Sequence, residues 1–111
     1  MKDIAMVVRQ LGVTSRHKGY FYLIEAVKIK MEMDDHPTLI TKDIYPFVAR
    51  KFHTSESSIE HGIWLVSKNC WKNHREELEK MSDIHLKESP TNTVLLDILA
   101  HKAASLEENN Q

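Results

Sequence analysis

The sequence predicts an all-α protein: one compact domain of about five or six helices that contains a helix-turn-helix candidate. Apolar residues recur at steps of three or four along most of the chain, and no pair of segments alternates polar and apolar residues as adjoining strands do. Only three Gly and three Pro interrupt 111 residues, of which 41% are hydrophobic and 28% charged. We therefore expect one helical domain over residues 1–106, with a frayed tail over 107–111.

Two amphipathic helices are expected in the first third of the chain. The apolar face of the first begins at Ile4, and Gly12 follows it as a stop signal. Thr14 and Ser15 carry hydroxyl groups that accept hydrogen bonds from first-turn amides, so they are the expected N-caps of the next helix. That second helix should end at about Met33, because the Asp-Asp-His-Pro run after it disfavours helix before its proline.

Two further helices, joined by a short polar turn, form the predicted helix-turn-helix over about residues 41–71. The first spans Thr41–Phe52, with Thr41 as its expected N-cap and Phe47 in its apolar stripe. The second spans Ser55–Trp71. Its apolar residues recur at steps of four, three and four and predict one buried face: Ile59, Ile63, Val66 and Cys70.

The last third is expected to hold a charged segment and a final helix. Residues 72–80 include few apolar positions, so we interpret them as solvated helix or loop. Ser, Pro, Thr and Asn at residues 89–92 are loop signals. Helical spacing returns after them, from Val94 to Ala103, and predicts the last amphipathic helix.

The charge and cysteine content exclude several classes of protein. A net charge of −1 argues against a uniformly basic nucleic-acid binder, so any DNA affinity depends on local charge. Residues 1–51 carry nine Lys and Arg against six Asp and Glu, whereas residues 52–111 carry six against ten. A single cysteine, Cys70, cannot form an internal disulfide, and its place on an apolar face indicates a small buried hydrophobe. We expect a cytoplasmic protein without a membrane span, since no apolar run approaches about 20 residues.

No motif indicates an enzyme, a metal or a cofactor. The seven histidines include no pair spaced i, i+4 and none with a cysteine at zinc-finger spacing. Ser, His and Asp occur without a nucleophile elbow or a glycine-rich phosphate loop. We therefore expect no catalytic residue, no metal ligand and no cofactor.

The candidate binding surface is the face of the second helix opposite its apolar residues. At about 100° per residue, this face carries Ser57, His61, Trp64 and Lys68. In a helix-turn-helix it would enter the major groove, where Ser and His exchange hydrogen bonds with base edges and Lys reaches guanine or phosphate. Trp64 suits a thymine methyl group or a protein contact. Periodicity alone leaves ordinary core packing as an equal alternative, because helical hairpins are common.

Three segments carry a resemblance to a known family. GVTSRHKGYFYLIEA, LITKDIYPFVARKFHTSESSIEHGI with Trp71 beyond it, and SPTN resemble, in this order, the C-terminal effector domain of the stage-zero sporulation response regulator. The resemblance runs from about Val7 to Leu106. It implies a six-helix domain with a helix-turn-helix, sequence-specific binding to double-stranded DNA as tandem dimers, and contact with the RNA polymerase sigma subunit. The family's full-length proteins carry a receiver domain before this region, and the chain suits both an excised domain and a free-standing effector.

The resemblance also marks departures in the predicted recognition helix. Three positions that carry DNA-contacting arginines in the family differ here: Ser58, His61 and Trp64. Ser89 likewise stands where the family has a lysine. Losing cations weakens both guanine recognition and phosphate binding. The predicted function is therefore a DNA-binding transcriptional regulator domain with altered or weakened operator specificity.

The expected contacts fall into two sets. In the major groove we expect Ser57, Ser58, Glu60, His61, Trp64 and Lys68. On the phosphates we expect Lys42, Arg50, Lys51, Arg16 and Lys18. The alternative is a diverged protein-interaction module that keeps the fold and binds a partner such as a full-length family member. It is motivated by Trp64 on a hydrophilic face and by the acidic second half of the chain.

Overall fold

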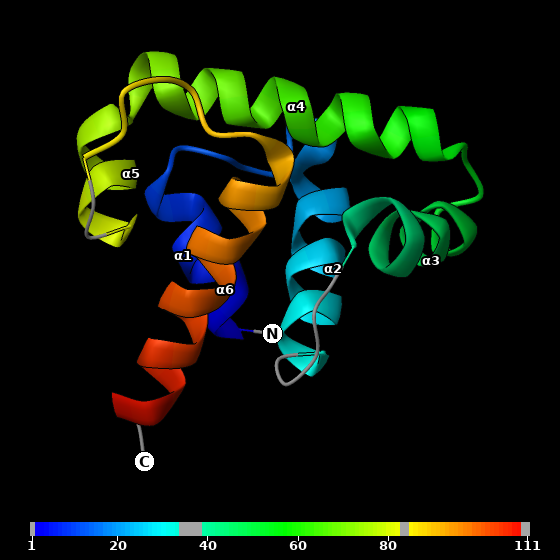
Figure 1. Cartoon of the computed structure of the whole chain (residues 1–111), viewed down its shortest axis with the longest axis horizontal. Helices are drawn as coiled ribbons and strands as arrows, with labels where there is room; N and C mark the ends of the chain where they lie inside the picture. Colours follow the sequence, from blue (N-terminus) through cyan, green and yellow to red (C-terminus); the bar gives the residue numbers. More distant parts are fainter. Residues whose placement is uncertain (1, 34–38, 83–84, 110–111) are drawn as a thin grey trace.

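The computed structural model describes residues 2–33, 39–82 and 85–109, and within these ranges every regular element is helical. The predicted all-α class is confirmed. The helix-breaking Asp-Asp-His-Pro run lies outside the described residues. Six α-helices and one short π-helical turn follow one another (Figure 1): α1 (Lys2–Gln10), α2 (Gly19–Glu32), η1 (Ile40–Ile44), α3 (Tyr45–Lys51), α4 (Glu56–Asn73), α5 (Arg75–Ser82) and α6 (Asn92–Asn109).

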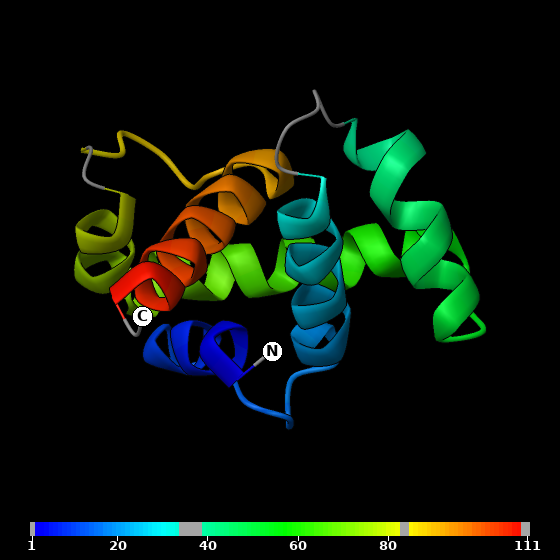
Figure 2. The same ribbon diagram turned by 90° about the horizontal axis from the view of Figure 1, so that it is seen from below.

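The long helix α4 lies across one end of the bundle that α1, α2 and α6 form (Figure 1). The same arrangement appears from below, where α3 flanks α2 on one side and α5 lies at the other end of α4 (Figure 2). All six α-helices contribute buried apolar side chains to one core, which includes Val7, Leu23, Val48, Ile63 and Leu99. The core therefore supports α4 from one side and leaves its opposite side in solvent.

The contact between α2 and α4 depends on a glycine. A Cβ atom at Gly19 would lie 2.3 Å from the carbonyl oxygen of Gly62, a distance that real Cβ atoms do not reach. At Gly62 the nearest atom to an added Cβ is a ring carbon of Tyr22 at 3.0 Å, and a ring can shift. Gly19 therefore lets the backbones approach, which places the first turn of α2 directly against the middle of α4.

The turn between α1 and α2 differs from the prediction. Gly12 ends α1 as expected, with a φ of 76°. Thr14 and Ser15, however, do not cap α2, which begins at Gly19 without a side-chain cap. Thr14 instead closes a turn with His17, because its N–H donates to His17 Nδ1 at 3.1 Å and the His17 N–H donates to its carbonyl at 2.9 Å. These local hydrogen bonds compete with the capping role.

The N-cap predicted at Thr41 is also wrong. The turn η1 begins at Ile40, and Leu39 is its N-cap residue. The N–H of Leu39 donates to Oδ2 of Asp43 at 2.9 Å, so a carboxylate inside the turn accepts from the N-cap amide itself. Thr41 lies inside η1, after its first residue, and therefore does not occupy the capping position.

The apolar stripe of α3 is rotated from the predicted one. Phe47 is 52% exposed, whereas Tyr45 is buried with Val48 and Ala49. Residues at i, i+3 and i+4 share one helical face, and here that face is centred on Tyr45, Val48 and Ala49, about 150° away from Phe47 around the helix axis. Pro46 lies in the first turn of α3, where its missing N–H is harmless.

The turn that joins α3 to α4 contains a strained residue. His53 has a φ of 53°, and its N–H donates to the carbonyl of Arg50 at 3.3 Å while the Thr54 N–H donates to the carbonyl of Ala49 at 3.0 Å. This pair of bonds is a Schellman motif, in which the left-handed position normally carries glycine.

We therefore expect His53→Gly to stabilise the protein by about 1 kcal/mol, because it relieves the left-handed strain of a residue with a Cβ atom. Urea unfolding followed by circular dichroism measures the change. The matched control is His101→Gly, the same replacement at an exposed position inside α6. The control should lower stability by about 0.5 kcal/mol, since glycine is a poorer helix former than histidine. A loss of stability in both variants would contradict the strain at position 53.

The C-terminal third is more helical than expected. Residues 75–82 form α5, and Leu78 and Met81 are buried, so the charged run contributes to the core as well as to the surface. Val94 is 37% exposed and lies outside the buried stripe of α6. The helix α6 continues to Asn109, which makes the first three residues of the predicted tail helical.

Candidate nucleic-acid interface

The helix α4 begins at a well-formed cap. Ser55 has an extended backbone, and its Oγ accepts a hydrogen bond from the Ser58 N–H at 3.1 Å. The two hydroxyl groups also lie 2.9 Å apart in a hydrogen bond. Ser58 is half-buried and engaged in the cap, whereas Ser57 in the same turn is exposed, as are Glu60, His61, Trp64 and Lys68 farther along the helix.

The buried face of α4 matches the prediction in full. Its four predicted residues are at most 2% exposed: Ile59, Ile63, Val66 and Cys70. The thiol of Cys70 faces the carbonyl of Leu11 at 3.7 Å, and burial raises the pKa of this thiol to about 12. Cys70 is thus a packing residue, because a thiol that stays protonated at neutral pH is a poor nucleophile.

The exposed face of α4 carries an ordered group of side chains. The rings of His61 and Trp64 stack with centroids 5.9 Å apart at an angle of 17°. Lys68 Nζ lies 5.4 Å from the centre of the Trp64 ring, within cation–π range. Ser57 and Glu60 are exposed on neighbouring turns. The structure therefore brings His61, Trp64 and Lys68 together, and Trp64 remains 46% exposed between its two neighbours.

The candidate phosphate contacts have different environments. Lys42 in η1 is exposed, as are Arg16 and Lys18 in the turn before α2. Arg50 is exposed on α3, with its guanidinium 5.6 Å from the centre of the Phe47 ring.

Lys51 differs from the other four, because its Nζ forms an ion pair with Glu25 Oε2 at 2.8 Å. Glu25 is only 14% exposed. The charge of Lys51 is therefore partly offset within the protein, and the other four cations are the more available ones.

A groove runs beside the stacked residues. It has a volume of about 330 Å³ and lies between α4 and the segment that leads into α6, with Trp64, Lys68 and Ser89 among the residues that line it. Ser67, which is fully buried, donates from its hydroxyl to the Pro90 carbonyl at 2.8 Å and so attaches this segment to α4.

A second attachment comes from the first residue of α6. Asn92 Nδ2 donates to Tyr45 Oη at 2.8 Å and to the Glu60 carbonyl at 3.1 Å. Tyr45 is only 3% exposed, and burial raises its pKa above the usual value near 10, while the hydrogen bond from Asn92 acts in the opposite direction. Sequence reasoning missed both residues, because Asn92 registers only as a loop signal and no local pattern relates it to Glu60, 32 positions away.

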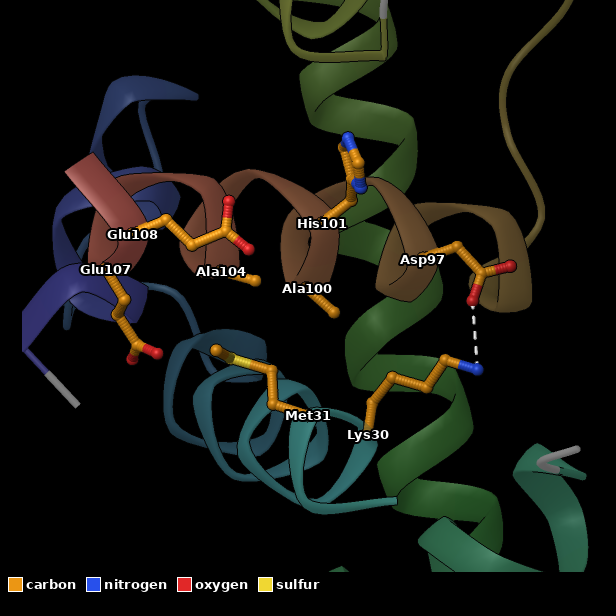
Figure 3. A pocket seen from close by; sticks show the side chains of 8 residues that line it. All are labelled: Lys30, Met31, Asp97, Ala100, His101, Ala104, Glu107 and Glu108. Atoms are coloured by element: carbon orange, nitrogen blue, oxygen red, sulfur yellow. Dashed lines mark ion pairs between the residues drawn. The ribbon is translucent and has the colours of Figure 1, made fainter. Parts of the chain in front are cut away.

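A larger groove lies away from this surface, between the C-terminal end of α2 and residues 97–108 of α6 (Figure 3). Its volume is about 480 Å³, and Met31, Ala100 and Ala104 lie along it. Lys30 and Asp97 form an ion pair of 3.1 Å at one end (Figure 3). None of the predicted site residues lines it.

The described residues hold neither a metal-ligand cluster nor a helix suited to span a membrane. Among them, no three His, Cys, Asp or Glu side chains are grouped in a way that could hold a metal ion. None of the helices in residues 2–33, 39–82 and 85–109 has both the length and the apolar character that a membrane crossing needs.

The sequence matches a known protein family over most of its length. The family is described as "Sporulation initiation factor Spo0A C terminal", and the match covers residues 4–103. It therefore begins in α1, includes all of α2 to α5, and ends within α6.

Proposed function

Because this chain belongs to the sporulation initiation factor Spo0A C-terminal family, whose members are DNA-binding effector domains, we propose that it binds duplex DNA through the exposed face of α4 with altered or weakened operator specificity. The arrangement of α4 carries the proposal. Its buried face packs against α2 and α3, while His61, Trp64 and Lys68 project on the opposite side. That is the arrangement of a recognition helix in a helix-turn-helix.

The chemistry of this face supports a different reading code from the family's. Lys68 supplies a point charge for guanine or a phosphate, and Ser57 and His61 exchange single hydrogen bonds with base edges. The ring of Trp64 offers an apolar contact for a thymine methyl group. No arginine occurs anywhere in α4, so the two parallel hydrogen bonds that a guanidinium makes to guanine are absent from this helix.

Positive charge around α4 supplies the sequence-independent part of binding. Lys42, Arg50, Arg16 and Lys18 are exposed and free to approach phosphates, together with Lys68 on α4 itself. The net charge of −1 limits long-range attraction, so binding should be modest and sensitive to salt. With about four phosphate contacts, log K should fall with log salt at a slope of roughly −4.

A titration of fluorescent random-sequence duplexes, read by anisotropy at several salt concentrations, tests the proposal. We expect binding at low salt with a slope of roughly −4, and a slope smaller by about 2 in Lys42→Ala/Arg50→Ala. The matched control Arg9→Ala/Lys80→Ala removes one Arg and one Lys from α1 and α5 and should leave the slope unchanged. Absence of binding at low salt would refute the proposal.

The second candidate function is a protein-interaction module, and the exposure of Trp64 favours it. Trp64 and its neighbour Leu65 are 46% and 47% exposed on the outer side of α4. An apolar contact there suits a second copy of the chain on DNA, a full-length family member, or the RNA polymerase sigma subunit. Sedimentation of Trp64→Ala with and without duplex DNA separates the two functions. Lost association with intact DNA binding would favour the interaction module, whereas unchanged association with lost DNA binding would favour DNA reading.

A further inference from the structure

We infer that Asn92 is a positioning residue for DNA binding: from the first turn of α6, its side chain sets the placement of the exposed face of α4. This inference rests on the proposed function. It concerns a residue that presents no group to DNA itself and acts through Glu60 and Tyr45. We call its two hydrogen bonds, to the Tyr45 hydroxyl and to the Glu60 carbonyl, the Asn92 bridge.

The Asn92 bridge connects three helices through one planar group. Asn92 belongs to α6, Tyr45 begins α3, and Glu60 lies in the second turn of α4. Both bonds are short, at 2.8 and 3.1 Å, and both use the same amide nitrogen. Two acceptors on one rigid NH₂ group restrain direction as well as distance, so the bridge holds α3 and α4 at one relative placement.

The attachment point on α4 lies in the turn that carries the candidate groove residues. In an α-helix the carbonyl of Glu60 also accepts from the N–H four residues later, which belongs to Trp64. A shift of the Glu60 carbonyl therefore moves the backbone of Trp64 and of His61, the residue that follows Glu60. The buried hydrogen bond from Ser67 to the Pro90 carbonyl attaches the residues just before Asn92 to α4. The position of Asn92 relative to α4 is therefore restrained by a second hydrogen bond.

The hydrogen bonds of the Asn92 side chain show which of its two polar groups connects the helices. Its Nδ2 uses two acceptors, whereas its buried Oδ1 has no hydrogen-bond partner among the described residues. Both hydrogen bonds of the bridge are therefore made by the NH₂ group, and Asn92→Ala removes both of them.

The test compares Asn92→Ala with Thr91→Ala, its neighbour in the chain. Thr91 Oγ1 accepts from the Val94 N–H at 3.2 Å and caps α6, so its removal weakens the same helix end without touching α4. Each variant is first titrated with urea to confirm that it is folded at the assay temperature. DNA affinity is then measured with the random-sequence duplexes, and ¹⁵N chemical shifts are recorded for residues 60–64.

We expect Asn92→Ala to lose about tenfold in DNA affinity, as two hydrogen bonds would suggest, and Thr91→Ala to lose less than twofold. Tyr45→Phe keeps the ring and removes the hydroxyl that accepts one of the two hydrogen bonds from Asn92. It should therefore lose less DNA affinity than Asn92→Ala, and it replaces Asn92→Ala in the test if that variant does not fold. The amide shifts of residues 60–64 should change in Asn92→Ala and stay constant in Thr91→Ala.

Equal affinity losses in the two variants, or unchanged shifts at residues 60–64 in Asn92→Ala, would overturn the positioning role. If the wild-type protein binds no duplex DNA, the proposed function fails by itself. The chemical shifts then still decide whether the Asn92 bridge places α4, because they are measured without DNA.

Discussion

Replacing Gly19 with Ala is expected to destabilise the protein by about 3 kcal/mol, at the upper end of the usual loss from overpacking. The added Cβ atom would lie 2.3 Å from a backbone carbonyl of α4, so relief requires the two helices to separate. Separation also loosens Val66, whose methyl carbon lies 2.9 Å from the same position. Thermal unfolding should show a melting temperature lower by roughly 10 to 20 °C.

The matched control for this variant is Gly62→Ala, on the facing helix. Here the nearest atom belongs to the flexible ring of Tyr22 at 3.0 Å, and alanine is the better helix former by about 1 kcal/mol. We expect a change in stability of no more than about 1 kcal/mol in either direction. Equal losses in the two variants would contradict the close approach of the backbone at Gly19.

Restoring cations on α4 is expected to produce the largest change in DNA binding. In His61→Arg/Trp64→Arg, two guanidinium groups would replace the stacked rings at positions where the family carries arginines. Each guanine contact contributes about 1–3 kcal/mol of discrimination, so the variant should bind its preferred sequences roughly a hundredfold more tightly. Selection from a random duplex pool, followed by anisotropy titration, measures both the affinity and the enrichment of guanine.

A charge-matched control separates recognition from simple attraction. Met6→Arg/Gln10→Arg adds two cations at exposed positions on α1, away from α4. It should raise affinity only slightly and enrich no sequence, whereas the α4 variant should also steepen the salt slope by about 2. Equal gains from both variants, or no enriched sequence in either, would argue against α4 as the recognition helix.

Local features of the fold were predictable from residues close together in the chain. The buried face of α4 follows from the spacing of Ile59 and Ile63, and its start follows from the hydroxyl of Ser55. Gly12 ends α1 for a similarly local reason, since its φ of 76° suits a residue without a Cβ atom. Each of these features depends on neighbours within about four residues, which the sequence displays directly.

Several local predictions were wrong because a nearby polar group offered a better partner. Thr14 forms a turn with His17 instead of the expected cap, and the turn η1 begins after Leu39, whose N–H donates to the carboxylate of Asp43, rather than at Thr41. Phe47 fits a helical stripe by its spacing but projects into solvent, because α3 turns its opposite face, with Tyr45, toward the core. Choosing between such alternatives requires knowing which face of α3 meets the rest of the protein.

Some features of the candidate site were likewise evident in the sequence, whereas others depend on tertiary contacts. The identities and helical phase of His61, Trp64 and Lys68 were evident in the sequence, because positions three and four apart share a face. That their rings and ammonium group form one stack, and that Asn92 reaches the same turn from α6, depends on side-chain placement and on contacts across the fold. Helical periodicity specifies on which face of a helix a side chain lies. It does not specify which distant segment of the chain packs against that face.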